Sequence, residues 1–344
     1  MTFAEALSSQ DLNTIRSFPK ADLHNHFVLG GSREYLYNKT GYEIESIEAP
    51  LKSMSEMDAW SSKYIGSRFN SPEGRRLLIA ATFEQAKSDG VTVLEIGEDV
   101  WGLGEFFDND IEKLIFSFQE ANAVIAPEIE LRLQIGISRH CPVDYLMNCL
   151  SHFWGHKEFY SIDLYGDELA QPIENFIPIY DKAAENGLVL KAHVGEWGTA
   201  KDIVSAVELL HLNEVQHGIA AVQDEDVIDY LIENNIRLNI TPSSNVLLGR
   251  VPEMEHHPIA LLYRKGVDVT IGSDDVLIFD SDVSKEYLRL YQSGCLTKEE
   301  LDDIRLNGLK ATEDKNFQNH AYGELIWQMK KFMECYSLKY FQCL

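Results

Sequence analysis

Four positions in three separate segments of the chain carry residues suited to binding one metal ion. His24 and His26 are two positions apart, and alternate residues of a strand point to the same side, so both imidazoles can reach one ion. His193 lies near the end of a later apolar run, and Asp274 lies near the end of the last such run. Three imidazoles and one carboxylate suit Zn²⁺ and leave a coordination position for water. The pattern predicts one zinc ion per chain.

Acid and base groups accompany these candidate ligands. Glu196 follows His193 by three residues, His217 ends another apolar run, and Asp275 is adjacent to Asp274. A bound metal lowers the pKa of its water toward ~7, and a neighbouring His, Asp or Glu can then move protons. Singly, each residue also fits an ordinary role, such as a carboxylate at a helix N-terminus. Two adjacent carboxylates, however, repel each other unless a cation or proton separates them. Together the groups indicate a metal-assisted hydrolase.

Eight short apolar runs, separated by helix-like stretches, must position these residues. The runs span residues 20–27, 91–98, 131–138, 160–167, 188–196, 214–220, 236–244 and 267–275. Strand–helix alternation indicates βαβ units and a parallel sheet, and eight strands is the number that closes a TIM-type (β/α)8 barrel. A doubly wound open sheet is the alternative. The barrel is favoured because the polar residues fall late in the runs, where a barrel gathers strand ends into one crater.

The remaining organisation indicates one domain over residues 1–344, with a barrel core at about 18–310. Residues 28–90 are longer than one crossover needs, which predicts extra helices between strands 1 and 2. A helical extension is expected after the last strand, at about 311–344, and the sequence assigns it no role. No internal repeat or Gly/Ser-rich linker divides the chain.

Composition restricts the partners. The chain has 30 Lys and Arg residues against 55 Asp and Glu residues, a formal net charge of −25. Such a field repels nucleic-acid polymers and anionic membranes, which favours a small neutral or cationic substrate. The five widely spaced cysteines indicate reduced thiols. No signal-peptide pattern and no apolar run of ~18 residues occurs, so we expect a cytoplasmic protein. The oligomeric state is left open.

Six segments resemble, in order, the adenosine deaminase family of the amidohydrolase superfamily. They are FPKADLHNH at 18–26, SIDLYGDE at 161–168, KAHVGE at 191–196, EVQHGI at 214–219, TPSSNVLLG at 241–249 and GVDVTIGSDDVLIF at 266–279. The combination of H-x-H, H-x-G-E, H-G and S-D-D is more specific than any one part. The resemblance implies the (β/α)8 barrel and a zinc-dependent aminohydrolase acting on C–N bonds of cyclic amidines. Its reaction would convert an adenosine-type 6-aminopurine nucleoside into its inosine-type product and ammonia.

The resemblance also implies residue roles. The zinc ligands would be His24, His26, His193 and Asp274. Glu196 would be protonated and share its proton with purine N1, while His217 and Asp275 would orient and deprotonate the attacking water. The Gly166 N–H would meet purine N3, and Asp275 would lie close to N7. The residues expected to contact the substrate are Gly166, Asp275, His26 and Trp197.

Two departures from the family pattern leave the substrate open. The family usually has Leu-Asp-Gly-Ser after the second histidine, and that Asp helps to hold the ribose. Here His26 is followed by Phe-Val-Leu-Gly-Gly-Ser, without an Asp, and Tyr165 stands where a small residue is usual. Adenosine, a modified nucleoside and free adenine therefore all stay open. So do a nucleotide, with its phosphate held by basic residues (Lys20, Arg33, Arg68, Arg75, Arg76), and opening of a cyclic amide. A metal-binding barrel acting as a non-catalytic binding module is the alternative from another class.

Overall fold

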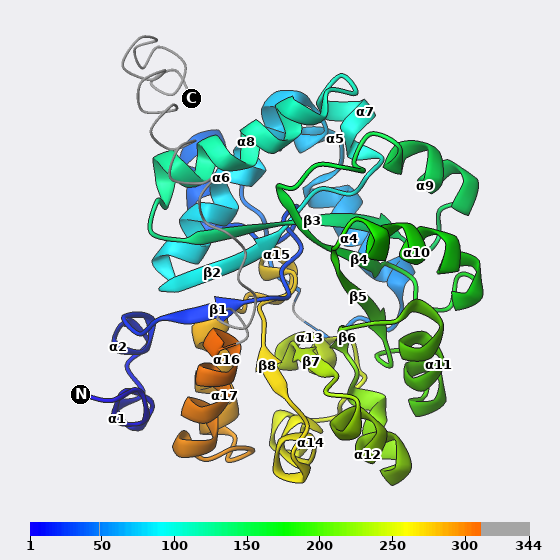
Figure 1. The fold of residues 1–344 in the computed structure, drawn as a ribbon. Coiled ribbons are helices and arrows are strands. Elements are labelled where there is room, and N and C mark those ends of the chain that lie inside the picture. The colour runs from blue at the N-terminus through cyan, green and yellow to red at the C-terminus, as the bar shows by residue number, and fades with distance from the viewer. Residues whose placement is uncertain (48, 311–344) are drawn as a thin grey trace.

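Eight parallel strands follow one another in chain order around the centre of the molecule, with helices outside them (Figure 1). The computed structural model describes residues 1–47 and 49–310. The strands are β1 (Lys20–Asp22), β2 (Val91–Ile96), β3 (Glu130–Ser138), β4 (Phe159–Tyr165), β5 (Val189–Val194), β6 (Glu214–His217), β7 (Arg237–Ile240) and β8 (Val269–Ile271). This arrangement confirms the predicted (β/α)8 barrel.

The barrel is joined between its first and last strands just beyond their carboxyl ends. Asn25 and Asp274 form an isolated parallel bridge. The Asp274 N–H donates to the His24 carbonyl at 2.8 Å, and the His26 N–H donates to the Asp274 carbonyl at 3.3 Å. α17 (Lys298–Lys310) packs against both β1 and β8, so a helix covers the rest of this β1–β8 seam.

Several helices connect β1 and β2, as the long interval predicts. They are α3 (Arg33–Thr40), α4 (Met54–Tyr64), α5 (Gly66–Phe69) and α6 (Pro72–Ser88). The Arg33 guanidinium donates to the Leu277 carbonyl at 3.2 Å and pairs with Asp280 at 3.3 Å. The loop after β1 is thereby fixed to the segment after β8.

The remaining helices lie before β1 and after β2. They are α1 (Phe3–Ser9), α2 (Leu12–Arg16), α7 (Gly102–Phe106), α8 (Ile111–Ile125), α9 (Val143–Leu150), α10 (Ile177–Glu185), α11 (Ala200–Leu210), α12 (Glu225–Glu233), α13 (Pro242–Leu247), α14 (Ile259–Lys265), α15 (Val276–Phe279) and α16 (Val283–Gln292), with 3₁₀ turns η1 (Ile173–Phe176), η2 (Ile219–Gln223) and η3 (Met254–His256). None of the helices within the described ranges has the length and hydropathy that a bilayer crossing requires.

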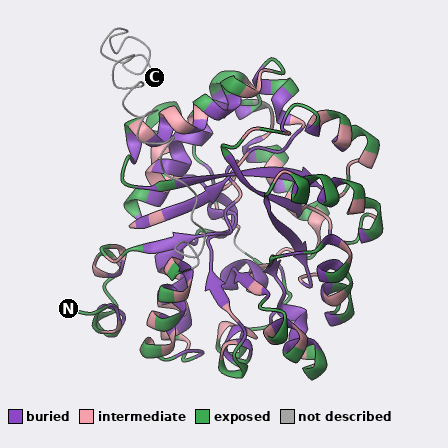
Figure 2. Cartoon of the chain, in the orientation of Figure 1, coloured by how far each residue is buried: buried purple, intermediate pink, exposed green. Residues whose placement is uncertain are grey.

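The strands are buried on both faces, whereas the outer helices expose one face (Figure 2). Parallel strands covered by helices lose water on both sides, which explains their nearly continuous apolar sequence. Inside the barrel the Lys191 ammonium lies 2.8 Å from Glu95 and 2.9 Å from Glu214. Burial opposes the charge of Lys191, but the two carboxylates hold its pKa above its usual value. This ion-pair group fixes three strands below the carboxyl-end crater.

Two sequence expectations need qualification. The run at 20–27 contains a strand only at Lys20–Asp22, because the chain leaves the ladder with β2 before His24 and instead meets the segment after β8. The histidines therefore lie beyond the strand rather than within it. The extension at about 311–344 lies outside the described residues, and the single domain over 1–344 stays a prediction.

Candidate active site

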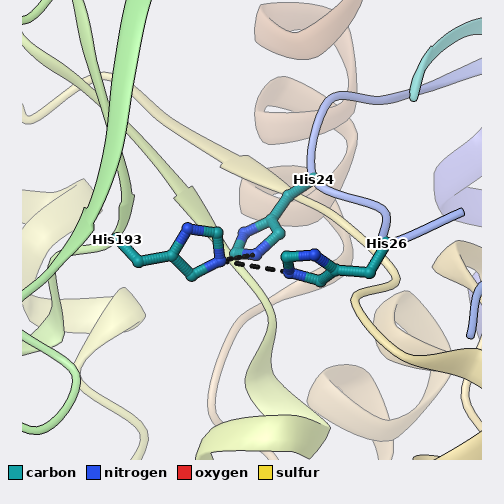
Figure 3. A group of neighbouring side chains, drawn as sticks. All are labelled: His24, His26 and His193. Carbon is teal, nitrogen blue, oxygen red and sulfur yellow. Dashed lines mark hydrogen bonds between the residues drawn. The ribbon is translucent and has the colours of Figure 1, made fainter. Parts of the chain in front are cut away.

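Three imidazoles from opposite sides of the barrel point at one another over the strand ends (Figure 3). The Nε2 atom of His193, from the end of β5, lies 3.1 Å from Nε2 of His24 and 3.1 Å from Nε2 of His26. His24 and His193 are buried. Ligand nitrogens about 2.0 Å from a tetrahedral zinc ion would be roughly 3.3 Å apart. The spacing of the three nitrogens therefore fits ligation of one ion.

The hydrogen bonds at the Nδ1 edges of His24 and His193 show why a cation fits between their Nε2 atoms. His24 Nδ1–H donates to the Asn239 carbonyl at 2.9 Å, and His193 Nδ1–H donates to Asp163 at 3.2 Å. With each ring proton on Nδ1, the facing Nε2 atoms of the neutral imidazoles present lone pairs to each other. Lone pairs at this distance repel unless a cation lies between them. Burial lowers the pKa of His24 to about 3, which keeps this ring neutral.

Asp274 adds a carboxylate to the three imidazoles. Its Oδ1 lies 3.4 Å from His26 Nε2, and its Oδ2 accepts a hydrogen bond from Thr241 at 3.0 Å. Asp274 has φ +58, and His217 has φ +64. Side chains other than glycine rarely adopt this conformation, and it is concentrated at functional sites. The donor set of three His and one Asp is thus assembled from the ends of β1, β5 and β8.

Glu196 lies beside this cluster with its carboxyl group buried. Burial, and then the charge of Asp274, raise the pKa of Glu196 to about 8. One of its oxygens accepts a hydrogen bond from the Asn245 amide at 2.8 Å and lies 3.5 Å from His217 Nδ1. Glu196 can therefore carry a proton at neutral pH and donate it to a substrate atom.

His217 is held as a neutral base on the same side of the cluster. Its Nδ1 lies 3.1 Å from the Thr241 hydroxyl and 3.1 Å from the Asn245 amide nitrogen. Burial, followed by the nearby His24, lowers the pKa of His217 well below its usual value. Asn245 is itself held by His257, whose Nε2 lies 3.2 Å from the Asn245 carbonyl oxygen. The acid and the base are therefore positioned by one shared amide.

Asp275 supplies a buried oxygen without a partner. Its Oδ1 has no hydrogen-bond partner among the described residues. Burial, and then the carboxylate of Asp274, raise the pKa of Asp275 well above its usual value. A divalent cation at the His/Asp cluster would offset this repulsion, because bound cations reverse the local preference for neutral carboxyls.

One backbone N–H group and one side-chain N–H group near the cluster also have no hydrogen-bond partner among the described residues. The Gly166 N–H, directly after β4, has no hydrogen-bond partner among the described residues. Trp197 Nε1 is buried and also without a partner in the part of the chain that the structure describes. The Arg250 guanidinium covers the Trp197 ring at 4.0 Å. These N–H groups can donate hydrogen bonds to acceptor atoms of a ligand.

Tyr165 forms an aromatic wall beside His26. The two rings meet edge to face, with centroids 5.2 Å apart and an interplanar angle of 86°. Burial, followed by the nearby charge of Asp99, raises the pKa of the Tyr165 phenol well above its usual value. Gly136 on β3 leaves room for it, because a Cβ there would lie 2.2 Å from the Tyr165 oxygen. Tyr165 therefore closes a side of the crater that a small residue would leave open.

The sequence analysis missed the residues that hold the loop carrying Glu196. Both carboxylate oxygens of Glu168 accept backbone N–H groups from Gly195, Glu196, Trp197 and Gly198, at 2.6, 3.1, 2.7 and 3.1 Å. The roles of Asp163, Asn239 and Asn245 were missed as well. Asp163 lies within an apolar run and Asn245 directly follows another, which was the available signal, but their partners are far away in sequence.

The basic residues considered for phosphate binding are occupied elsewhere. Lys20 is fully buried and donates to the Phe18 carbonyl at 2.7 Å. Arg75 pairs with Glu98 at 2.9 Å, and the Arg68 guanidinium lies 3.6 Å over the Tyr42 ring. Arg33 is bound to the segment after β8, and Arg76 pairs with Glu73 at 3.0 Å on the surface.

Comparisons with known proteins agree with this geometry. The sequence profile of the adenosine deaminase family matches residues 19–320. An adenine deaminase of Vibrio parahaemolyticus is 29% identical over 320 residues, covering 87% of this chain and 92% of that protein. An adenosine deaminase of Plasmodium falciparum is 28% identical over 300 residues, covering 80% of each. The crystal structure of an adenine deaminase from Arthrobacter aurescens shares the fold, with a TM-score of 0.74 and 23% identity over 91% of this chain and 99% of that one. The chain belongs to the adenosine deaminase family and is a hydrolytic deaminase.

Proposed function

We propose that the protein is a zinc-dependent deaminase of an adenosine-type 6-aminopurine nucleoside, with one zinc ion per chain. The single observation that carries this proposal is the convergence of three imidazoles and Asp274, with the carboxyl group of Glu196 beside His217. The residues that would hold the ion are His24, His26, His193 and Asp274. A zinc ion bound there would supply a water of lowered pKa and a positive charge.

The protein residues would orient the purine and move its protons. Glu196 donates a hydrogen bond to purine N1, which makes C6 more electrophilic. The free Gly166 N–H donates to N3, and the unpartnered Oδ1 of Asp275 lies towards N7. His217 and Asp275 orient the attacking water, whose oxygen bonds to C6 as Glu196 protonates N1. One proton of the water passes through these residues to the amino group, and the proton of the hydroxyl left on C6 restores Glu196 when the C6–N bond breaks. Ammonia then leaves, and the inosine-type product remains.

Free adenine is the second candidate substrate. It is favoured by the loop after His26, where apolar residues replace the Asp that holds ribose in the family. Leu29 in this loop accepts a hydrogen bond from the Leu277 N–H at 2.7 Å. The backbone of this loop is thus hydrogen-bonded to the segment after β8.

A substrate panel tests the proposal. Zinc-loaded protein is assayed with adenosine, 2′-deoxyadenosine, adenine, N6-methyladenosine and AMP, by ammonia release and the ultraviolet change from adenine to hypoxanthine. We expect the highest kcat/KM with adenosine or 2′-deoxyadenosine. A preference for adenine would establish the second candidate, and turnover of none of them would overturn both.

The Glu196→Gln variant separates an enzyme from a binding module. Gln keeps the size of the side chain but removes the transferable proton, so we expect turnover to fall at least ~1000-fold, towards the upper range of general-acid contributions. Zinc content, measured by atomic absorption, should stay near one per chain. Unchanged turnover in this variant would contradict the role of Glu196. The exposed Glu174→Gln is the matched control.

A further inference from the structure

The turn after β3 places one imidazole beside the free N–H of Gly166. A Cβ on Gly166 would lie 3.3 Å from Nδ1 of His140, and Gly166 has φ +89. A side chain at position 166 would therefore be strained and would crowd His140. His140 is exposed, and no hydrogen bond or ion pair of its side chain is recorded among the described residues.

The backbone on both sides of His140 is fixed. The Arg139 N–H donates to the Tyr165 carbonyl at 2.7 Å, and the Cys141 N–H donates to the Ser138 carbonyl at 3.0 Å. The Gln171 amide donates to the carbonyls of both Arg139 and Cys141. The Arg139 guanidinium in turn donates to the Gln171 carbonyl at 3.0 Å. The turn is thus held from two strands and from residue 171, while the imidazole that it carries stays unengaged.

The geometry of a purine indicates which part of the substrate would lie near this imidazole. N3 and N9 of a purine are both bonded to C4, so a group that binds N3 also lies next to the substituent on N9. In the proposed function, on which this inference rests, the Gly166 N–H binds N3. We infer that His140 hydrogen-bonds a sugar hydroxyl of the substrate and so replaces the missing Asp after His26 as a determinant of nucleoside over free base.

The surrounding charges favour a neutral hydroxyl over a phosphate. Asp167 follows Gly166 directly, and the carboxylate of Asp99 is close enough to His140 to interact electrostatically with it. Acidic neighbours in a chain of net charge −25 repel a phosphate dianion. An imidazole nitrogen can donate to a hydroxyl or accept from it, so the contact needs no net charge.

The test compares substrates with and without a sugar. Zinc-loaded wild type, His140→Ala and His140→Gln are assayed with adenosine, 9-methyladenine, adenine and AMP. We expect His140→Ala to lower kcat/KM for adenosine about tenfold, mainly through KM, since the contact is made in both the ground and transition states. Activity with 9-methyladenine and adenine should be unchanged. His140→Gln should recover part of the loss, because its amide can still hydrogen-bond.

Deoxynucleosides identify the hydroxyl. Among 2′-, 3′- and 5′-deoxyadenosine, the one lacking the group that His140 binds should be processed equally by wild type and His140→Ala. The matched control is His152→Ala, an exposed histidine on another segment, which should behave as wild type with every substrate. Melting temperatures check that each variant is folded.

Several results would overturn the inference. An equal loss with adenosine and 9-methyladenine would mean that His140 acts only through the structure of the turn. No loss with adenosine, a wild type that deaminates adenine but not adenosine, or a larger loss with AMP than with adenosine would each reject the hydroxyl contact. If wild type deaminates no 6-aminopurine, the proposed function itself fails, a result that is visible without any variant.

Discussion

At the scale of single residues, the protonation of Glu196 controls the pH dependence of the reaction. Its pKa is raised to about 8 by burial and then by Asp274, so the protonated form prevails below that pH. We expect kcat to fall as pH rises through about 8, because the ionised carboxylate cannot donate to the purine. A pH–rate profile measures this fall. The residual activity of Glu196→Gln should lack it, and an identical fall in that variant would assign the pKa to another group.

In the proposed metal site, Asp163 positions the ligand His193. Its carboxylate accepts the Nδ1–H of that ring at 3.2 Å. Burial opposes ionisation of Asp163, but its interaction with His193, including this hydrogen bond, holds its pKa at about 2. We expect Asp163→Asn to weaken zinc binding about 10–100-fold, the usual effect of removing such a partner. Competition with a chelator measures the affinity, and an unchanged dissociation constant would contradict the role.

At the scale of elements, the loop after β5 depends on a single carboxylate from the segment after β4. Glu168 accepts four successive backbone N–H groups from that loop. In Glu168→Gln, one oxygen becomes an amide nitrogen that cannot accept, so Glu196 loses its fixed position. We expect kcat to fall about 10–100-fold, because misplacing a catalytic group by about 1 Å can cost about 100-fold. Glu174→Gln again serves as the control, and a variant with normal kcat would show that the loop is held by other contacts.

The sequence predicts the features that depend on local interactions, but it does not predict contacts between residues that are far apart in the chain. All eight strands were predicted, because helix-covered parallel strands have continuous apolar runs bounded by polar residues. At the start of α17, the Thr-x-x-Glu spacing of Thr297 and Glu300 is typical of a capping box, and the two residues exchange both of its hydrogen bonds. The four-fold contact of Glu168 and the amide of Asn245 were not predicted. Their partners are 27 to 30 residues away for Glu168 and 49 and 28 for Asn245, so neither spacing nor periodicity identifies them.

At the scale of the whole molecule, the metal cluster and the β1–β8 seam share residues. The backbone groups of His24, His26 and Asp274 make the bridging hydrogen bonds, and their side chains converge on the cluster. Metal that binds only the folded state stabilises it by about 4 kcal/mol at ~1000 times Kd. We expect chelation to abolish activity, lower the melting temperature and raise amide hydrogen exchange first at residues 24–26 and 272–275. Equal exchange increases around all eight strands would contradict a local effect at the seam.

The origin of the ligands also sets the order of events during biosynthesis. A ribosome completes His24 and His26 long before it reaches Asp274, and β1 has no β8 to join until then. The nascent polypeptide therefore holds an incomplete set of donors through most of translation. If the proposed ligand set is correct, acquisition of the metal ion becomes a late maturation step, and a product truncated before the last strand would be unable to acquire the complete ligand set.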